Sequence, residues 1–364
     1  MRRRTLVGLG VAAAAAVGGA VLLTPREAPP PPPSAAQLAF PGLAQRLAGA
    51  SRIEIRRADA TLVLERQGAQ PGTPVAGETW LLPAKSGYPA RGERVREMLV
   101  GLTELRLTER RTANPELLDQ LGLEDPARPG ATSILLRVLD AAGAPIVELV
   151  TGRRRVRTQG DVPESIYVRR PAETQAWLAE GRLPLDTDPQ LWIDRDLANL
   201  PRERVQRVAV TRGEARLELA REGETLRIVS PADAPPADEI ALDEIGRGFE
   251  FLTFQDVKRE AELGGEAVGE AVFTLTDNLA VTVRTSREGE AVWVRLAAAG
   301  DDEAARLNAR WRGWAYQLGA WKEKAFAPRL EDLKARERNA PPPGAVPGLP
   351  GGPAVEAPAA PPAR

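Results

Sequence analysis

The sequence predicts an α+β protein with two tandem, similar units of mainly antiparallel sheet, each with helices packed on one face, preceded by a single N-terminal transmembrane helix. Three observations predict this class: a long apolar run near the N-terminus, many short segments of alternating apolar and polar residues, and one order of such segments that occurs twice. A chain of 364 residues is long enough for two domains of ordinary size.

The apolar run extends without interruption from Leu6 to Leu23 and follows three arginines, Arg2, Arg3 and Arg4. As a helix it would be about 27 Å long, close to the hydrocarbon thickness of a bilayer. We therefore expect a cytoplasmic basic tip at 1–5 and a transmembrane signal-anchor at 6–23, with the rest of the chain outside the cytoplasm.

Cleavage of this segment as a signal peptide is the alternative, because small residues that fit a cleavage site occur at Gly18-Gly19-Ala20 inside the apolar run. The sequence contains no cysteine, so it excludes a lipoprotein anchor. A proline-rich spacer at 24–40 follows the run, and an extended polyproline conformation is expected for it. A tail at 336–364, rich in Pro, Ala and Gly, is expected to be disordered.

The first unit is expected at 41–200. Hairpin-length connections between its short strands favour antiparallel pairing. Val95, Leu99, Leu102 and Leu105 fall at helical spacing between two groups of strands. The expected strands are 51–57, 61–66, 78–83, 133–139, 146–150 and 166–169.

The second unit is expected at 201–335 and repeats this order. Ile245, Phe249 and Leu252 fall at helical spacing, and Gly248 aligns with Gly101 of the first unit without a gap. A long helix from Asp301 to Lys324 is expected near its end. The expected strands are 205–210, 215–219, 224–229, 271–276, 279–284 and 292–295.

The composition excludes several kinds of chemistry. The sequence has no histidine and no cysteine, which removes thiol nucleophiles, Ser-His-Asp arrangements and zinc sites built on these residues. With 49 basic and 50 acidic residues the net charge is −1, and this argues against a nucleic-acid binder. We therefore expect no catalytic residues, no cofactor, no metal and no nucleic-acid partner.

One run of residues carries a family resemblance. Residues 117–126, Leu-Leu-Asp-Gln-Leu-Gly-Leu-Glu-Asp-Pro, resemble the hallmark of the DUF4340 proteins, and 150–152, 165–168 and 192–197 follow in the expected order. The resemblance covers roughly 51–330. It implies a bacterial membrane-anchored protein, often encoded beside a gliding-motility-type ABC transport system, and it carries over no catalytic residue.

Within the hallmark, Leu121, Gly122, Leu123 and Pro126 form a structural motif in our interpretation. Gly122 would end a short helix in the left-handed conformation, both leucines would pack back, and Pro126 would prevent continuation. A loop that contacts a partner is the alternative. The second unit has no equivalent of this motif.

Two further clusters are candidate interaction sites. Arg153, Arg154, Arg155 and Arg157 form the densest basic cluster, expected in a loop between two strands, where it would bind an anionic group or remain solvated. The expected C-terminal helix carries an apolar stripe, for which core packing is the default and a partner surface the alternative. The stripe consists of Leu307, Trp311, Trp314, Leu318 and Trp321.

The sequence and the resemblance together indicate a non-enzymatic envelope protein of the bacterial inner membrane, single-pass, with a cytoplasmic N-terminus and a periplasmic bulk. It would contact the membrane through Leu6 to Leu23 and act as an accessory or scaffold of an ABC-type transport system. The alternative is a periplasmic binding module for an anionic glycan or lipid, with its small-molecule ligand unknown. A hydrolase based on acidic pairs such as Asp186/Asp188 and Asp194/Asp196 comes third.

Overall fold

The computed structural model describes residues 36–68, 79–155 and 164–335. They divide into two compact units, the first ending at Arg195 and the second starting at Asp196. The boundary expected from the sequence lay five residues later. The segment 6–23, most of the proline-rich spacer and all of the C-terminal tail at 336–364 lie outside the described residues.

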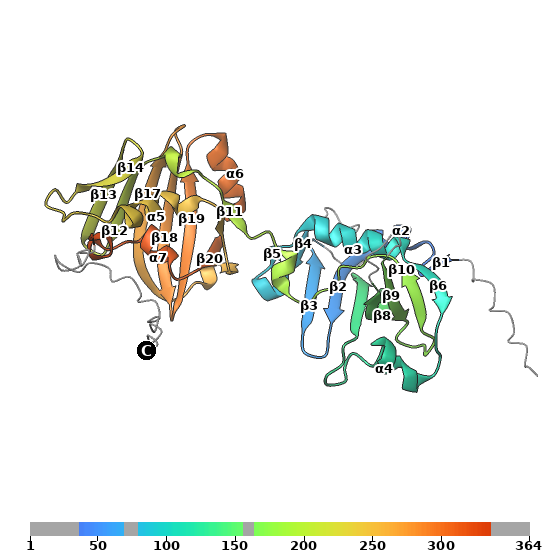
Figure 1. The fold of residues 1–364 in the computed structure, drawn as a ribbon. Helices are drawn as coiled ribbons and strands as arrows, with labels where there is room; N and C mark the ends of the chain where they lie inside the picture. The colour runs from blue at the N-terminus through green and yellow to red at the C-terminus, as the bar shows by residue number, and fades with distance from the viewer. Residues whose placement is uncertain (1–35, 69–78, 156–163, 336–364) are drawn as a thin grey trace, which may run out of the picture. The chain divides into compact units, whose positions relative to one another are not determined.

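Unit 1 is built on one long antiparallel sheet with short helices between its strands (Figure 1). Its helices are α2 (Leu43–Arg46), α3 (Gly92–Glu104) and α4 (Leu118–Leu121). Its strands are β1 (Gln37–Leu38), β2 (Ala50–Arg56), β3 (Thr61–Arg66), β4 (Trp80–Leu82), β5 (Tyr88–Pro89), β6 (Arg106–Arg110), β7 (Ile134–Asp140), β8 (Pro145–Arg155), β9 (Ser165–Arg169) and β10 (Trp177–Glu180).

The order of strands across this sheet is β1-β6-β10-β9-β8-β7-β2-β3-β4-β5. The alternation read from the sequence explains its core, because in β2 Ile53 and Ile55 are buried while Arg52 and Glu54 are only partly covered. Helix α3 buries Val95, Met98 and Leu102. All of these core positions were expected from the periodicity of the sequence except Met98.

Unit 2 combines an eight-stranded antiparallel sheet with a small two-stranded one. Its helices are α5 (Glu239–Gly246), α6 (Asp302–Trp311) and α7 (Lys322–Phe326). Its strands are β11 (Asp196–Ala198), β12 (Val205–Arg212), β13 (Ala215–Glu222), β14 (Thr225–Ser230), β15 (Leu252–Thr253), β16 (Asp256–Arg259), β17 (Glu266–Leu275), β18 (Ala280–Glu288), β19 (Ala291–Ala299) and β20 (Trp314–Leu318).

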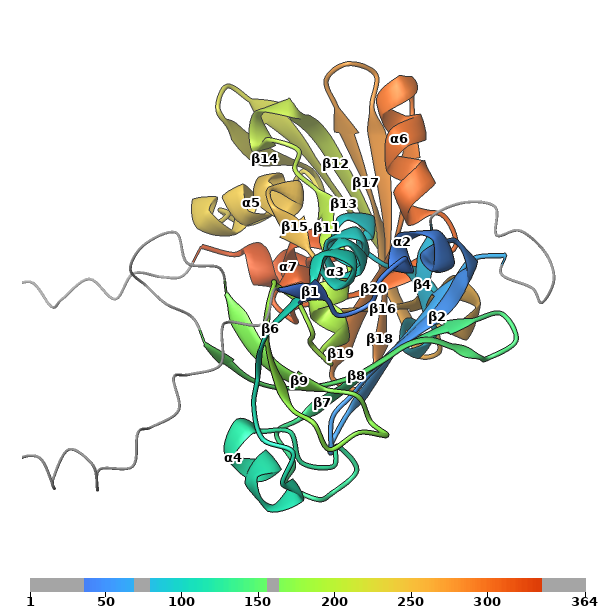
Figure 2. The same ribbon diagram turned by 90° about the vertical axis from the view of Figure 1, so that its right-hand side faces the viewer.

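An aromatic cluster forms part of the core of unit 2. The ring centroid of Phe249 lies 4.9 Å from that of Phe273 and 5.2 Å from that of Phe326. Phe326 belongs to α7, which packs beside α5 (Figure 2). The cluster therefore joins α7 and the 3-10 turn that contains Phe249 to strand β17.

The two large sheets share one topology. The order in unit 2 is β14-β13-β12-β17-β18-β19-β20-β16, and in unit 1 the run from β4 to β6 is β4-β3-β2-β7-β8-β9-β10-β6. Each strand of the second order has a counterpart at the same place in the first and in the same order along the chain. Unit 1 adds β5 and β1 at its two edges.

The expected helix from Asp301 to Lys324 is wrong. Helix α6 ends at Trp311, Gly313 takes a left-handed φ of 82°, and the following residues form strand β20 within the sheet. Trp311, Trp314 and Trp321 fall at a spacing typical of a helical stripe, although Trp314 is the first residue of a strand.

Within the described ranges, no helix combines the length and the apolar character that crossing a membrane requires.

Candidate functional site

The segment 117–126 is closely packed. Gly122 takes a left-handed φ of 67° at the end of α4, as expected, and Leu123 and Pro126 are buried. The Leu123 backbone N–H donates to the Leu118 carbonyl oxygen over 2.9 Å. Arg169 on β9 donates through Nε to the Leu123 carbonyl oxygen over 2.8 Å.

Glu124 fixes the chain that follows this turn. Its carboxylate accepts hydrogen bonds from the Thr132 backbone N–H, from Thr132 Oγ1 over 2.9 Å and from the Ser133 backbone N–H over 3.3 Å. Burial raises the pKa of Glu124, but these hydrogen bonds outweigh burial, so the pKa lies below its ordinary value. The buried glutamate is therefore an ionised acceptor that holds two loop segments together.

Two of the family-like segments, 117–126 and 150–152, pack against each other. A Cβ atom at Gly152 would lie 2.3 Å from the Leu121 carbonyl oxygen and 2.7 Å from that of Gly122. A Cβ atom at Gly122 would lie 3.1 Å from Cγ of Arg153. The glycines permit this close approach of two backbones, and the interpretation of the motif as structural agrees with this geometry.

Gly152→Ala should lower the free energy of unfolding by about 1–3 kcal/mol, because the added methyl group collides with backbone that cannot rotate away. Gly49→Ala is the matched control, since nothing lies within 4 Å of a Cβ there, and it should change stability by less than about 0.5 kcal/mol. Urea denaturation of both variants checks this. Equal stability of the two variants would contradict the packing described.

The basic cluster does not form the expected loop. Arg153, Arg154 and Arg155 are the last residues of β8, where Arg154 pairs with Ile166 and Arg155 with Ser165 of β9. Strand β8 is longer than the sequence indicated because the partner strand continues to pair with its polar end. Arg154 donates through Nη2 to the Leu183 carbonyl oxygen. Arg157 lies outside the described residues.

The three candidate tryptophans have different environments. Trp311 is buried and donates through Nε1 to the Leu197 carbonyl oxygen over 3.1 Å. Trp314 is also buried, with the guanidinium carbon of Arg259 3.9 Å from its ring centroid. Only Trp321 of these three is exposed, at 68%. Two of the three tryptophans therefore pack in the core and one lies on the surface. Neither core packing nor a partner surface alone describes the whole stripe.

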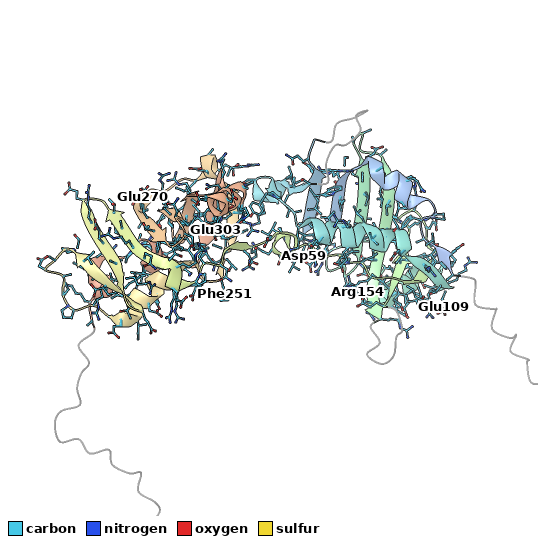
Figure 3. All side chains as sticks on the ribbon, turned by 90° about the horizontal axis from the view of Figure 1, so that it is seen from above. Asp59, Glu109, Arg154, Phe251, Glu270 and Glu303 are labelled. Atoms are coloured by element: carbon cyan, nitrogen blue, oxygen red, sulfur yellow. The ribbon has the colours of Figure 1, made fainter. Side chains whose placement is uncertain are left out.

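Phe251 is an exposed aromatic residue that the sequence reading missed. It is 79% exposed and takes a positive φ of 45°, an unusual conformation for a residue with a side chain (Figure 3). Its backbone N–H donates to Asn199 Oδ1 over 3.2 Å. We call Phe251 and Trp321 together the aromatic surface.

The two residues of the aromatic surface are attached to segments that contact each other. Trp321 precedes α7, and its neighbour Lys322 donates through Nζ to the Gly248 carbonyl oxygen over 2.9 Å. Gly248 belongs to the short 3-10 helix η6 (Arg247–Phe249), which ends two residues before Phe251. The Trp321 ring lies against Gly319, where any Cβ would collide with it.

Glu323 is a second residue that the sequence reading missed. It is buried in α7, and its two carboxylate oxygens pair with Arg212 of β12, at 3.1 Å, and with Arg287 of β18. Burial raises the pKa of Glu323, while hydrogen bonds from Arg287 and Arg212 lower it, and the net pKa lies below the ordinary value. This network ties α7 to two strands.

The Asp186/Asp188 pair serves local structure. Asp188 accepts from the Gln190 backbone N–H over 2.9 Å at the start of a 3-10 turn, and Asp186 accepts from the Asp188 backbone N–H over 2.9 Å. Glu303 forms a two-pronged ion pair with Arg204, at 3.0 and 2.7 Å. Across residues 36–68, 79–155 and 164–335, no group of three acidic side chains is placed to hold a metal ion.

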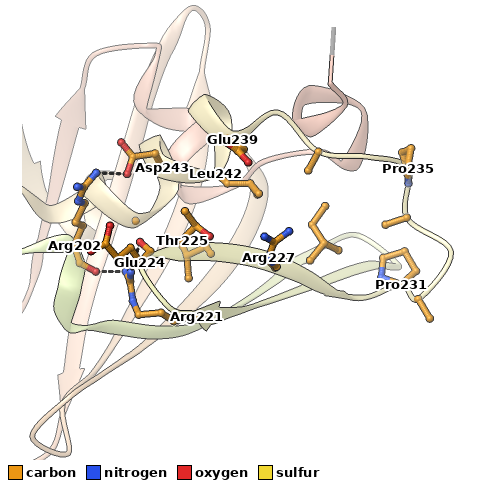
Figure 4. Close-up of a pocket in the computed structure, with 16 residues that line it drawn as sticks. Arg202, Arg221, Glu224, Thr225, Arg227, Pro231, Pro235, Glu239, Leu242 and Asp243 are labelled. Atoms are coloured by element: carbon orange, nitrogen blue, oxygen red, sulfur yellow. Dashed lines mark hydrogen bonds and ion pairs between the residues drawn. The ribbon is translucent and has the colours of Figure 1, made fainter. Parts of the chain in front are cut away.

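In each unit one cavity lies beside a longer helix, α3 in unit 1 and α5 in unit 2. The one in unit 2, about 240 Å³, lies between β14 and α5, and an ion pair of 2.5 Å between Arg202 and Asp243 crosses its wall (Figure 4). The one in unit 1, about 620 Å³, lies between β4, α3 and the segment around Leu47, and its wall is mainly apolar. Neither cavity was expected from the sequence.

The fold defines a two-unit, mainly antiparallel α+β protein. A family model described as a domain of unknown function, DUF4340, matches residues 80–267, more than half of the chain. The chain belongs to this family. The match is shorter than the 51–330 expected from the resemblance, but it contains the hallmark segment. No curated protein and no solved structure matches the chain.

Proposed function

We propose that this protein is a non-enzymatic, membrane-anchored envelope protein of the bacterial periplasm that acts as an accessory or scaffold of an ABC-type transport system. The aromatic surface is the observation that carries the proposal. Large aromatic side chains exposed at 79% and 68% are uncommon on a surface that only faces water, and aromatic residues dominate the energetics of protein interfaces.

The local geometry of both residues supports a binding role. Phe251 keeps a strained backbone conformation although its side chain makes little contact with its own unit, and such strain concentrates at functional positions. The Trp321 ring lies against Gly319 while the residue remains 68% exposed, so the ring is accessible to a partner.

The membrane part of the proposal is supported by the sequence. The apolar run from Leu6 to Leu23 has the length of a transmembrane helix and follows three arginines. The transport part is supported by membership of the family, whose members are expected beside ABC transport components. A tether that keeps the aromatic surface near the bilayer would raise its effective concentration for a membrane partner.

The test is crosslinking of the full-length protein in its own membranes, followed by detergent solubilisation and affinity capture. Wild type should recover ABC-transporter subunits, and Phe251→Ala combined with Trp321→Ala should reduce their recovery at least tenfold. Val229→Ala, at another exposed apolar position of the same unit, is the control and should leave recovery unchanged. Equal recovery with the double variant, or recovery without any transporter subunit, would contradict the proposal.

We also infer that the two units are tandem copies of one module, each with its helices on one face of the sheet. The shared strand order supports this inference. So do Arg66 and Arg221, which occupy the same place: Arg66 pairs with Trp80 across β3 and β4, and Arg221 pairs with Leu226 across β13 and β14.

The alternative function, a periplasmic binding module for an anionic glycan or lipid, is favoured by a different observation from the one the sequence suggested. The arginines of β8 are part of a strand, whereas the open cavity of unit 1 has a mainly apolar wall.

A further inference from the structure

A groove of about 510 Å³ lies between β11 and α6 in unit 2, and Phe251 belongs to its wall. Glu303 and Phe251, which are both labelled in Figure 3, line it together with Leu197, Leu200 and Leu307. The groove is open, its wall is mainly apolar, and its volume lies within the range of binding sites for small ligands. Phe251 is therefore part of a concave apolar site and not an isolated exposed side chain.

The helix on one side of this groove is specific to unit 2. Helix α6 lies between β19 and β20, whereas the corresponding strands of unit 1, β9 and β10, are joined by residues 170–176 without a helix. With Gly101 aligned to Gly248, Phe251 falls on Glu104, so the shared fold accepts a polar residue at this position. The shared fold therefore requires neither the helix nor the aromatic ring, and unit 2 has both at the same groove.

Hydrogen bonds hold the two sides of the groove together. Arg310 of α6 donates through Nη1 to the Asp196 carbonyl oxygen over 2.7 Å. The next residue, Trp311, donates through Nε1 to the Leu197 carbonyl oxygen over 3.1 Å, so two side chains of α6 bind the backbone of β11. The groove is therefore formed before any partner enters it, which lowers the cost of binding.

Arg306 is the charged side chain of the wall that remains available to a partner. It is exposed, and it forms no hydrogen bond or ion pair with another described residue. The other charged groups are engaged: Glu303 pairs through both oxygens with Arg204, Arg310 binds β11, and Asp196 has an interaction of its own. Arg306 lowers the pKa of Glu303 through its charge, but less than Arg204 does. The groove therefore combines an apolar wall with one unpaired positive charge.

We infer that this groove binds a peptide segment of a partner protein in which an acidic side chain stands beside a large apolar one. The apolar side chain packs between Phe251 and Leu307, and the carboxylate pairs with Arg306. A guanidinium group holds a carboxylate through two parallel hydrogen bonds, and a complementary charge of this kind selects among apolar partners. The inference rests on the binding role proposed for Phe251 and adds the chemistry of the partner.

A lipid surface fits the groove less well than an acidic peptide does. Attraction to an anionic membrane takes a cluster of about four to eight basic residues. The described wall has one unpaired arginine, Arg306, and it also contains the carboxylates of Glu303 and Asp196. Its charge therefore suits a single acidic side chain.

The test places p-benzoyl-phenylalanine at position 251 of the full-length protein in its own membranes, which keeps an aromatic ring there. Light should produce a crosslink to a protein, and peptide mass spectrometry locates the crosslinked segment of that partner. Arg306→Glu should reduce the yield of the crosslink about tenfold, because a carboxylate then repels the acidic segment. Replacement by lysine of one acidic residue next to the crosslinked position of the partner should restore the yield with Arg306→Glu.

Arg312→Glu is the matched control for Arg306→Glu. Arg312 caps the C-terminus of α6, is also exposed and has no hydrogen bond or ion pair with another described residue, but it does not line the groove. The control should leave the yield of the crosslink unchanged although it alters the net charge by the same amount. Both variants should keep the far-ultraviolet circular dichroism spectrum of wild type, because both side chains are exposed.

Several outcomes would overturn the inference. They are crosslinks to lipid alone or to no protein, full yield with Arg306→Glu, an equal loss with Arg312→Glu, and no restoration by any lysine replacement in the partner. A failure of the scaffold role gives a different result. A partner that is no transporter subunit, but whose crosslink depends on Arg306, would contradict the scaffold role and support the groove. Transporter subunits crosslinked equally well with Arg306→Glu would do the reverse.

Discussion

Replacing Phe249 with alanine should lower the free energy of unfolding of unit 2 by about 3–5 kcal/mol. The ring is fully buried and contacts Phe273 and Phe326, so its removal leaves a cavity in the middle of the aromatic cluster and loses two ring–ring contacts. Phe249 aligns with Leu102, which is equally buried in α3 of unit 1. The loss would therefore show that Phe249 has the same core-packing role in unit 2 that its burial gives Leu102 in unit 1.

Phe251→Ala is the matched control, because it removes the same side chain two residues further along. Phe251 is largely exposed, so we expect a change of less than about 0.5 kcal/mol. Hydrogen exchange of the backbone amides of β17 and α5, with and without urea, measures both effects. A similar loss in the two variants would show that the aromatic cluster does not carry the core as described.

Replacing Glu323 with glutamine should cost about 2–3 kcal/mol at pH 7. Glutamine keeps the shape but removes the charge, which leaves Arg212 without its anion in a mostly buried place. This loss of stability is smaller than breaking a fully buried ion pair would cause, because Arg287, the second partner of Glu323, is half exposed and water screens its charge. Lys324→Gln, at an exposed position of the same helix, is the control and should be nearly neutral.

The cost of Glu323→Gln should depend on pH. The pKa of Glu323 is lower in the folded protein than the ordinary value, about 4.3 for an unfolded chain. Its contribution is therefore fully present above pH 4.3 and is lost as the pH falls through the lower folded-state pKa. Urea denaturation should show a smaller difference between wild type and variant at pH 3 than at pH 7. A difference that is the same at both values would contradict an ionised, paired glutamate.

Much of the fold could be predicted because it depends on local patterns. Alternation in segments such as 51–57 and 205–210 indicated β2 and β12, and hairpin-length connections indicated antiparallel pairing. The turn at Gly122 was also predicted, since a left-handed glycine before Leu123 and Pro126 has a local physical reason. The family match confirms the resemblance that the hallmark segment carried.

The errors arose where distant residues decide the structure. Trp314 and Leu318 fit a helical stripe, but the pairing of β20 with β16 and β19 makes them part of a sheet. Glu323 reads as an ordinary surface residue, because Arg212 and Arg287 lie 111 and 36 positions away in the sequence. The end of β8 reads as a loop because Arg153–Arg155 are polar, although β9 pairs with Arg154 and Arg155.

The candidate sites were less predictable than the fold for the same reason. Phe251 stands in an apolar stretch, Phe251-Leu252-Thr253-Phe254, where Leu252 and Phe254 are buried and only the structure shows which side chains face outward.

The most direct test of the scaffold proposal places a photocrosslinking amino acid at position 321 of the full-length protein in native membranes. The buried position 311 is the control, because a group there faces the protein's own core. We expect light-dependent crosslinks from position 321, but not from 311, to a permease or ATPase subunit of an ABC transporter. Crosslinks from 321 to no transporter subunit, or the same crosslinks from both positions, would contradict the proposed function.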